Sequence, residues 1–168
     1  MPNDPRIELS TAGVVAVLAV LAYASTVTSV GTVAFWYVGP YLVANQWLIA
    51  YTWLHHTHVD MPHFGPDEFS FLRGAISTID RPRAYGPLIN HLHHHIGATH
   101  VAHHVCSAVP HYRAEALRDA LIPVLGQRYC VDDTPIWKAL YLVARDCRYM
   151  EGLSGTQFWK TMRENKAS

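Results

Sequence analysis

The sequence predicts a mainly α-helical integral membrane protein, in which a two-helix transmembrane hairpin is followed by a histidine-rich helical cytosolic region. Three observations predict this fold class. Of the 168 residues, only 15% are charged and 50% are hydrophobic, whereas soluble domains carry about 25% charged residues. No Asp, Glu, Lys or Arg lies between Glu8 and Asp60. The chain also has 12 histidines, and none of them precedes His55.

The charge balance and the cysteines exclude several classes of protein. The 13 Lys and Arg residues equal the 13 Asp and Glu residues in number, so nothing favours binding to nucleic acid. The high hydrophobic content excludes a disordered chain. Cys106, Cys130 and Cys147 form neither an even set nor a CxxC pair, which indicates a reducing compartment without a disulfide framework.

The uncharged stretch is long enough for two membrane-spanning helices, Thr11–Val30 and Thr32–Leu54, because one span needs about 20 apolar residues. The turn between them is expected within Ser25–Gly31, where small and polar residues let the backbone leave the helix. Pro40 should kink the second span. The predicted organisation is an N-terminal flank (1–10), a transmembrane hairpin (11–54) and a cytosolic histidine-rich region (55–168).

The first span is expected to be retained, because Met1–Glu8 lacks the basic segment and the cleavage site of a signal peptide. All Lys and Arg residues except Arg6 follow the second span, which by the positive-inside rule places the histidine-rich region in the cytosol. A buried helix pair in a soluble core is the disfavoured alternative, since soluble helices rarely lack charges over such a length. Arg73, Arg81 and Arg83 are expected as solvated charges with a few structural pairs, or else as contacts to a lipid headgroup or an acidic partner.

Three helical stretches are expected beyond the spans. The pattern permits a helix within 88–105, and a short amphipathic helix is expected over Ala114–Leu121, ending near Pro123. Pro135 stands where the first turn of a helix through Met150 would begin. No stretch alternates clearly enough to predict a β-strand.

The spacing of the histidines predicts a metal-binding face. His100, His103 and His104 occupy positions i, i+3 and i+4 of a helix, so their imidazoles should share one side of it. Neutral imidazole binds iron or zinc without adding negative charge beside lipid. The alternative is a solvated polar face. The same spacing recurs upstream at His91, His94 and His95, and further histidines stand at His55, His56, His58 and His63.

Seven segments follow one another in the order Thr52–Phe64, Arg73–Arg81, His91–His104, Pro110–Tyr112, Ile122–Gly126, Asp133–Pro135 and Phe158–Lys160. In this order they resemble the C-terminal part of the membrane fatty-acyl desaturases, most closely the delta-12 / omega-3 group and its fungal members. The likeness extends from about Phe35 to Lys160, so the chain would form part of a larger desaturase fold.

This resemblance implies a fatty acid desaturase, an oxidoreductase that uses O₂ to introduce a cis double bond into an acyl chain during unsaturated fatty acid biosynthesis. It implies two non-haem iron ions held by three histidine boxes, and an acyl-lipid or acyl-CoA substrate within membrane lipid. It also implies electron supply from cytochrome b5 and its reductase, and a location in the endoplasmic reticulum.

The resemblance places iron ligands at His56 and, in the third histidine box, at His100, His103 and His104. No catalytic residue is expected beyond the metal ligands. The role of His55 stays open, because many relatives have Gln at that position. Weaker candidates that would support the ligands are His58, His63, His94, His95 and Asp80.

The first two boxes of the family have no counterpart here, because no histidine precedes His55. We therefore expect a C-terminal fragment that lacks the N-terminal half of a desaturase, holds the irons only in part and is inactive alone.

Three alternatives remain open. The same scaffold could hydroxylate or acetylenate the acyl chain. A membrane-anchored protein could bind or transport a metal, with zinc on the imidazoles, although transport should place ionisable residues within the spans. A truncated, non-catalytic desaturase-like chain could fold against the full-length enzyme or compete with it.

Overall fold

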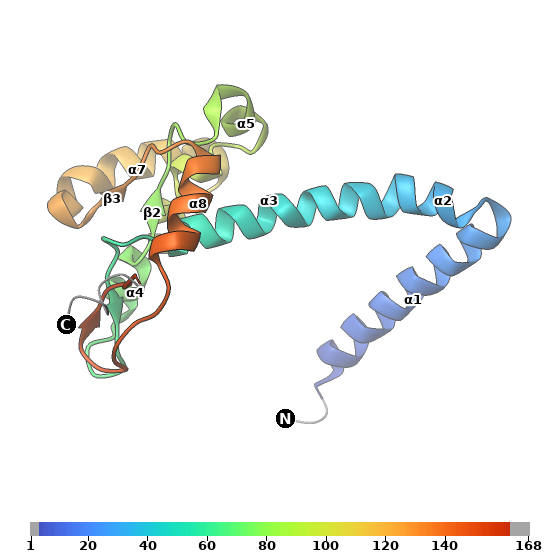
Figure 1. Cartoon of the computed structure of the whole chain (residues 1–168), viewed down its shortest axis with the longest axis horizontal. Coiled ribbons are helices and arrows are strands. Elements are labelled where there is room, and N and C mark those ends of the chain that lie inside the picture. Colours follow the sequence, from blue (N-terminus) through green and yellow to red (C-terminus); the bar gives the residue numbers. More distant parts are fainter. Residues whose placement is uncertain (1–3, 162–168) are drawn as a thin grey trace. The chain divides into compact units, whose positions relative to one another are not determined.

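The computed structural model describes residues 4–161, which are mainly helical (Figure 1). The helices are α1 (Pro5–Val27), α2 (Val30–Val33), η1 (Ala34–Val38, a π-helical turn), α3 (Gly39–His56), α4 (Phe71–Ile76), α5 (Gly86–Leu92), η2 (Ile96–Ala98), α6 (His100–Val105), α7 (His111–Leu125), η3 (Gly126–Arg128) and α8 (Ile136–Asp146). The strands are β1 (His63–Phe64), β2 (Ile79–Asp80), β3 (Cys130–Val131) and β4 (Thr156–Gln157). The chain divides into two compact units between Leu48 and Ile49.

The first unit begins with α1, which starts earlier than the predicted span. Asp4 caps it by accepting a hydrogen bond from the backbone N–H of Arg6 at 3.0 Å, and Pro5 fits the first turn, where no N–H is needed. The helix then breaks at Thr28 and Ser29, where the Ser29 hydroxyl accepts a bond from the N–H of Thr32 at 3.0 Å. The break lies inside the predicted turn and is shorter than that turn.

Helix α1 is the one helix of residues 4–161 that is long and apolar enough to cross a membrane. None of its described residues is buried within the described part of the chain. Helix α3 has 18 residues but contains Asn45, Gln46 and two terminal histidines, which make it less apolar. The residues 30–56 are nevertheless helical almost throughout.

The kink expected at Pro40 takes the form of a widened turn. Pro40 follows η1 directly, and the N–H of Gly39 donates to the carbonyl of Ala34, five residues earlier. Proline has no N–H and its ring crowds the preceding turn, so a wider turn at this place relieves both problems without ending the helix.

The second unit has a small core in which β2 lies beside α6. Its fully buried apolar side chains include Leu54, Met61, Ile79 and Val101. Strand β2 pairs in parallel with β3, and β1 pairs in antiparallel with β4. The sequence did not predict these strands, because two-residue strands are too short for an alternating pattern.

The helix permitted over 88–105 is broken in three. Helix α5 ends at Leu92, because His94 and His95 adopt left-handed backbone angles with φ of 54° and 59°, which do not continue a helix. The continuous helix that the pattern permits is therefore absent, and His91, His94 and His95 do not lie on one helix. The two later helices are present with shifted ends, since α7 runs past the internal Pro123 to Leu125 and α8 ends at Asp146.

A substitution at Gly97 tests the packing of this unit. An added Cβ at Gly97 would lie 2.7 Å from two carbons of the buried Tyr85 ring, so Gly97→Ala should lower the free energy of unfolding by about 1–3 kcal/mol. Thermal unfolding of the detergent-solubilised chain would measure this loss. Gly13→Ala is the control, because nothing lies within 4 Å of its added Cβ, and equal melting of both variants would contradict the packing.

Candidate metal centre

Three imidazoles from two helices meet in the second unit. His56 is the last residue of α3, and His100 and His104 lie one turn apart on α6. The Nε2 atom of His100 lies 3.1 Å from that of His56 and 3.2 Å from that of His104. One nitrogen of each of the three rings lies within 4.8 Å of the others.

This arrangement suits a metal ion better than a set of hydrogen bonds. An imidazole nitrogen in the neutral ring carries either one N–H or one lone pair, so Nε2 of His100 cannot form a full hydrogen bond with both neighbouring Nε2 atoms. An ion with metal–nitrogen bonds of about 2.1 Å would bridge nitrogens 3.1–3.2 Å apart. The three residues therefore fit a metal ion that prefers nitrogen ligands, such as zinc or iron.

Burial keeps these imidazoles in the form that binds metal. Desolvation lowers the pKa of His56, His100 and His104 below the ordinary value, and neighbouring histidines lower it further for His100 and His104. Neutral imidazole is the metal ligand. The site is therefore ready to bind metal at neutral pH without first losing protons.

His103 does not join this group, although the spacing predicted that it would. Its ring centre lies 5.9 Å from those of His100 and His104, and its side chain is exposed. At about 100° per residue, positions i+3 and i+4 lie on opposite sides of position i. His56 approaches the side of His104, so His103 faces a different direction from the same helix.

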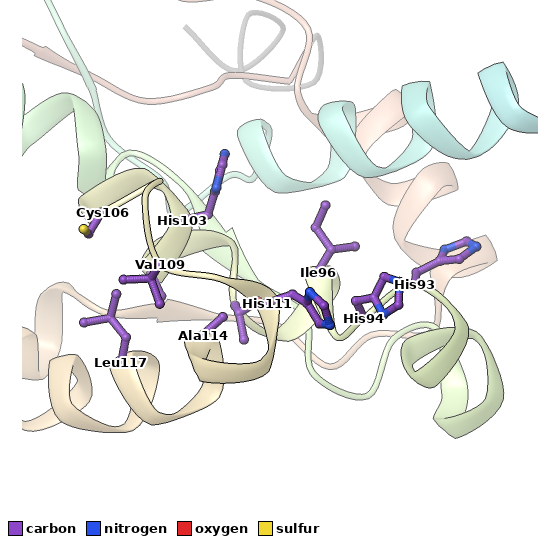
Figure 2. A pocket seen from close by; sticks show the side chains of 11 residues that line it. His93, His94, Ile96, His103, Cys106, Val109, His111, Ala114 and Leu117 are labelled. Carbon is purple, nitrogen blue, oxygen red and sulfur yellow. The ribbon is translucent and has the colours of Figure 1, made fainter.

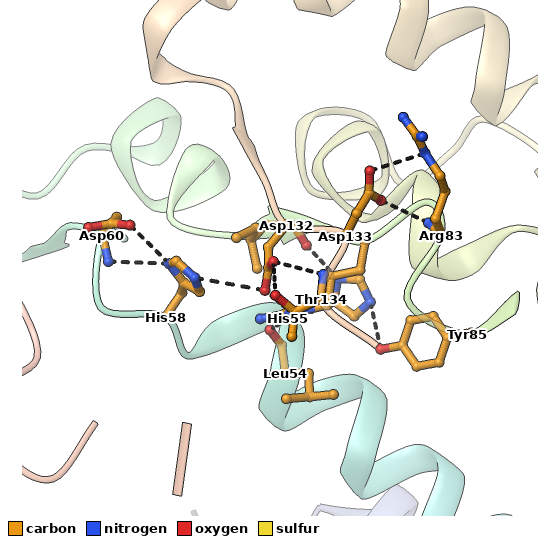
Figure 3. A network of polar contacts seen from close by, with 11 residues as sticks. Leu54, His55, His58, Asp60, Arg83, Tyr85, Asp132, Asp133 and Thr134 are labelled. Atoms are coloured by element: carbon orange, nitrogen blue, oxygen red, sulfur yellow. Dashed lines mark hydrogen bonds and ion pairs between the residues drawn. The ribbon is translucent and has the colours of Figure 1, made fainter. Parts of the chain in front are cut away.

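His55 is buried but is engaged elsewhere. Its Nδ1 atom lies 2.5 Å from the carbonyl oxygen of Ile79, and its Nε2 atom lies 3.3 Å from the hydroxyl of Tyr85 (Figure 3). The ring centre is 4.6 Å from that of His100. Both nitrogens of His55 are in hydrogen bonds, so His55 packs against the three-histidine group without offering a free ligand atom.

The weaker candidates lie around the group and outside it. His58 lies between the carboxylates of Asp60 and Asp132, at 3.7 and 3.8 Å (Figure 3). The ring of His63 packs edge-on against Trp159, with centroids 5.5 Å apart. Neither residue is part of the three-histidine group that residues 4–161 contain.

His94 and His95 are not members of the three-histidine group and contact other residues. The His94 ring pairs with that of His111 at a centroid distance of 4.4 Å, and His95 lies 3.5 Å from a carboxylate oxygen of Glu115. A separate cavity of about 280 Å³ has His94 and His111 at one end and includes His103 and the free Cys106 (Figure 2). Sequence spacing gave no indication of the His94–His111 pair.

Asp80, expected from the sequence as a residue that would support the ligands, makes its hydrogen bonds to the backbone of α6 and to Tyr129. Its buried carboxylate accepts a hydrogen bond from the backbone N–H of Val101 at 2.9 Å and one from the Tyr129 hydroxyl at 2.6 Å. Arg81 is also buried, and not a solvated surface charge, because it pairs with Asp132 and donates from Nε to the carbonyl of Leu54 at 3.0 Å. Neither role has a signature in residue spacing.

The described residues thus combine one helix long and apolar enough to cross a membrane with three imidazoles that could hold a metal ion, which is the class of fold and site the sequence predicts. The sequence matches the family described as fatty acid desaturase over residues 3–134. The chain belongs to the fatty acid desaturase family, which confirms the resemblance noted in the sequence.

Three curated relatives show how far this similarity extends. The chain is 40% identical to a delta(12) fatty acid desaturase of Mortierella alpina over 161 residues, which cover 94% of this chain and 40% of the relative. It is 40% identical to a delta(12)-fatty-acid desaturase of Arabidopsis thaliana over 158 residues, covering 89% and 40%. It is 46% identical to an omega-6 fatty acid desaturase, endoplasmic reticulum isozyme 1, of Glycine max over 117 residues, covering 70% and 30%.

The chain thus spans less than half the length of these relatives. No solved structure gave a significant match.

Acid should destabilise the metal-free second unit through its buried histidines. Burial lowers the pKa of His55 to about 4, whereas the unfolded side chain has a pKa of about 6.5. The unfolded state binds more protons below pH 6.5, so stability is complete above that pH and is lost as the pH falls. His55 alone should cost about 2 kcal/mol between pH 7 and pH 5.

Urea unfolding in detergent with EDTA at pH 7, 6 and 5 would measure this loss. His55→Gln is the matched variant, because glutamine does not titrate, and it should reduce the pH dependence. Equal stability of the unsubstituted chain at pH 7 and pH 5 would contradict the burial of a neutral His55.

Proposed function

We propose that this chain is the part of a membrane acyl desaturase that carries the third histidine box, and that it acts by holding iron beside the acyl chain. The delta(12) and omega-6 names of its relatives favour insertion of a cis double bond into an acyl-lipid or acyl-CoA substrate. The observation that carries the proposal is the convergence of the Nε2 atoms of His56, His100 and His104.

The three imidazoles would hold one iron ion, and His103 would serve a second ion from the other side of α6. When bound, the iron pair supplies the oxidising power to break an unactivated C–H bond with O₂. The protein residues position the ions: α3 presents His56, and α6 presents the other ligands. Because His103 is exposed and separated from the cluster, the second ion requires ligands from outside residues 4–161.

Lipid would surround the first unit. Most large apolar side chains along α1, such as Leu9, Leu18 and Tyr23, are exposed in the protein. The 23 helical residues reach about 35 Å, enough to cross about 30 Å of hydrocarbon. An apolar groove within this unit has Val14 and Leu18 on one wall and Tyr37 and Tyr41 on the other. We infer that α1 and the helical residues 32–54 form a transmembrane hairpin, and that neighbouring helices or acyl chains fill this groove.

The distribution of cationic residues along the chain favours one orientation in the membrane, and the names of the relatives favour one membrane. Almost all cationic residues follow the second span, which favours a cytosolic location for residues 55–168. The endoplasmic reticulum isozymes among the relatives favour that membrane. Electrons would then come from a cytosolic donor such as cytochrome b5 with its reductase.

A chimera tests the proposal. The matching part of the Mortierella alpina delta(12) desaturase would be replaced by this chain and produced in a host that lacks delta-12 desaturation. We expect a new delta-12 double bond in the host acyl chains, measured by gas chromatography and mass spectrometry of the lipids. Hydroxylated or acetylenic products would instead assign a sister reaction.

Two histidine variants separate a metal role from general damage. His104→Ala should lower the product of the chimera at least 100-fold, because it removes a ligand. His91→Ala is the matched control, since His91 is exposed and lies outside the cluster, and it should leave the product unchanged. An inactive chimera at normal expression, or full activity in His104→Ala, would refute the proposal.

A further inference from the structure

Four consecutive residues, Thr78–Arg81, contact both helices that carry the converging histidines. Their side chains are at most 2% exposed. They include strand β2, which pairs in parallel with β3. This segment contains no metal ligand, yet it is the element that touches the end of α3 on one side and the start of α6 on the other.

Toward α3, the segment satisfies the last turn of the helix. The Thr78 hydroxyl donates to the carbonyl of His55 at 2.8 Å, and Nε of Arg81 donates to the carbonyl of Leu54 at 3.0 Å. The last carbonyls of a helix have no partner within it. These bonds fix the helix end one residue before His56, so they restrict where the His56 imidazole can lie.

Toward α6, the segment supplies the cap that the helix lacks. Thr99 precedes α6 without a side-chain capping bond, and the first N–H groups of a helix need an acceptor. Asp80 Oδ1 accepts from the N–H of Val101 at 2.9 Å, and the N–H of Arg81 donates to the carbonyl of Gly97 at 2.5 Å. Both bonds lie within three residues of His100 and fix the start of its helix.

The segment Thr78–Arg81 is itself held in place by Tyr129 and Asp132, which belong to neither of the two helices. The Tyr129 hydroxyl donates to Asp80 Oδ2 at 2.6 Å, the N–H of Asp132 donates to the Asp80 carbonyl at 3.0 Å, and the Arg81 guanidinium pairs with the Asp132 carboxylate. Figure 3 shows that Asp132 also bonds to Thr134. Because each Asp80 oxygen has its own donor, the carboxylate cannot rotate away from α6.

We propose that Thr78–Arg81 is the positioning element of the metal centre, and that Asp80 is its principal positioning residue: by hydrogen bonding to the backbone of α6, it holds His100 and His104 opposite His56 before an ion arrives. The inference rests on the proposed function, in which these histidines bind metal. Asp80 acts on the helix and not on a ligand ring, so its effect depends on an acceptor at Oδ1 more than on its charge.

Metal titration of the purified full chain in detergent micelles tests this role, with Co²⁺ as the probe because its absorption spectrum reports the coordination. Asp80→Ala should weaken Co²⁺ binding about 10- to 100-fold, the usual effect of removing a residue that supports ligands, and it should alter the visible spectrum. Asp80→Asn keeps an oxygen acceptor for Val101 and should bind within about threefold of the unsubstituted chain. A purely structural loss would not reproduce this rescue together with the spectral change.

Asp133→Ala is the matched control, because Asp133 bonds to the exposed Arg83 and should leave Co²⁺ binding unchanged. If Asp80→Ala fails to fold by circular dichroism, Tyr129→Phe decides, since it removes only the hydroxyl that orients Asp80 and should weaken binding about threefold or more. Unchanged affinity in the folded Asp80→Ala variant, or in Tyr129→Phe if that variant must decide, would overturn the inference.

The two proposals fail in different ways. If the unsubstituted chain binds no Co²⁺, or if His104→Ala binds it equally well, the metal site of the proposed function fails. If the unsubstituted chain binds Co²⁺ and His104→Ala does not, while Asp80→Ala binds normally, only the positioning role fails. Equal weakening by Asp80→Asn and Asp80→Ala would also overturn it, because charge would then be the cause.

Discussion

The constraint on which the second unit depends is the close approach of three uncharged imidazole nitrogens. At separations of 3.1 and 3.2 Å, Nε2 of His100 cannot form a full hydrogen bond with both neighbouring nitrogens, and burial disfavours the protonated forms that would supply further donors. Such a geometry persists only if the surrounding structure holds it or a cation occupies its centre. The hydrogen bonds of Thr78–Arg81 to both helix ends can hold the geometry, and three imidazole nitrogens are suitable ligands for a cation at the centre.

The polar groups around the cluster are arranged so that few net charges lie near it. His55 is held neutral by burial and bonded at both nitrogens, and Arg81 is matched by Asp132. Burial raises the pKa of Asp80 to about 6, although hydrogen bonds from Tyr129 and from the start of α6 oppose this rise. Buried charges are costly unless they are paired or hydrogen-bonded. This network therefore keeps the net charge beside the three histidines small.

Sequence reasoning predicted the parts of this protein that are marked by a regular residue spacing or by an unusual composition. The uncharged stretch located the helical first unit, and the spacing of His100 and His104 located two of the three converging imidazoles. The spacing did not show that His103 lies apart from them, because a shared helix face is wide and the direction from which His56 approaches is a tertiary property. The helix through His94 and His95 failed because a left-handed backbone at histidine has no sequence signature. Strands β2 and β3, and the burial of Arg81, depend on contacts between residues about fifty positions apart.

The parallel pairing of β2 with β3 also determines the order in which parts of the second unit can form during synthesis. Asp80 and Arg81 find Tyr129 and Asp132 only across separations of 49 and 51 residues, and long-range contacts of this kind form late. During synthesis on the ribosome, His56, His100 and His104 all emerge before the segment that completes their support. The nascent chain therefore exposes these imidazoles before their support exists, and the hydrogen bonds that hold Thr78–Arg81 can be complete only after residue 132 has been synthesised.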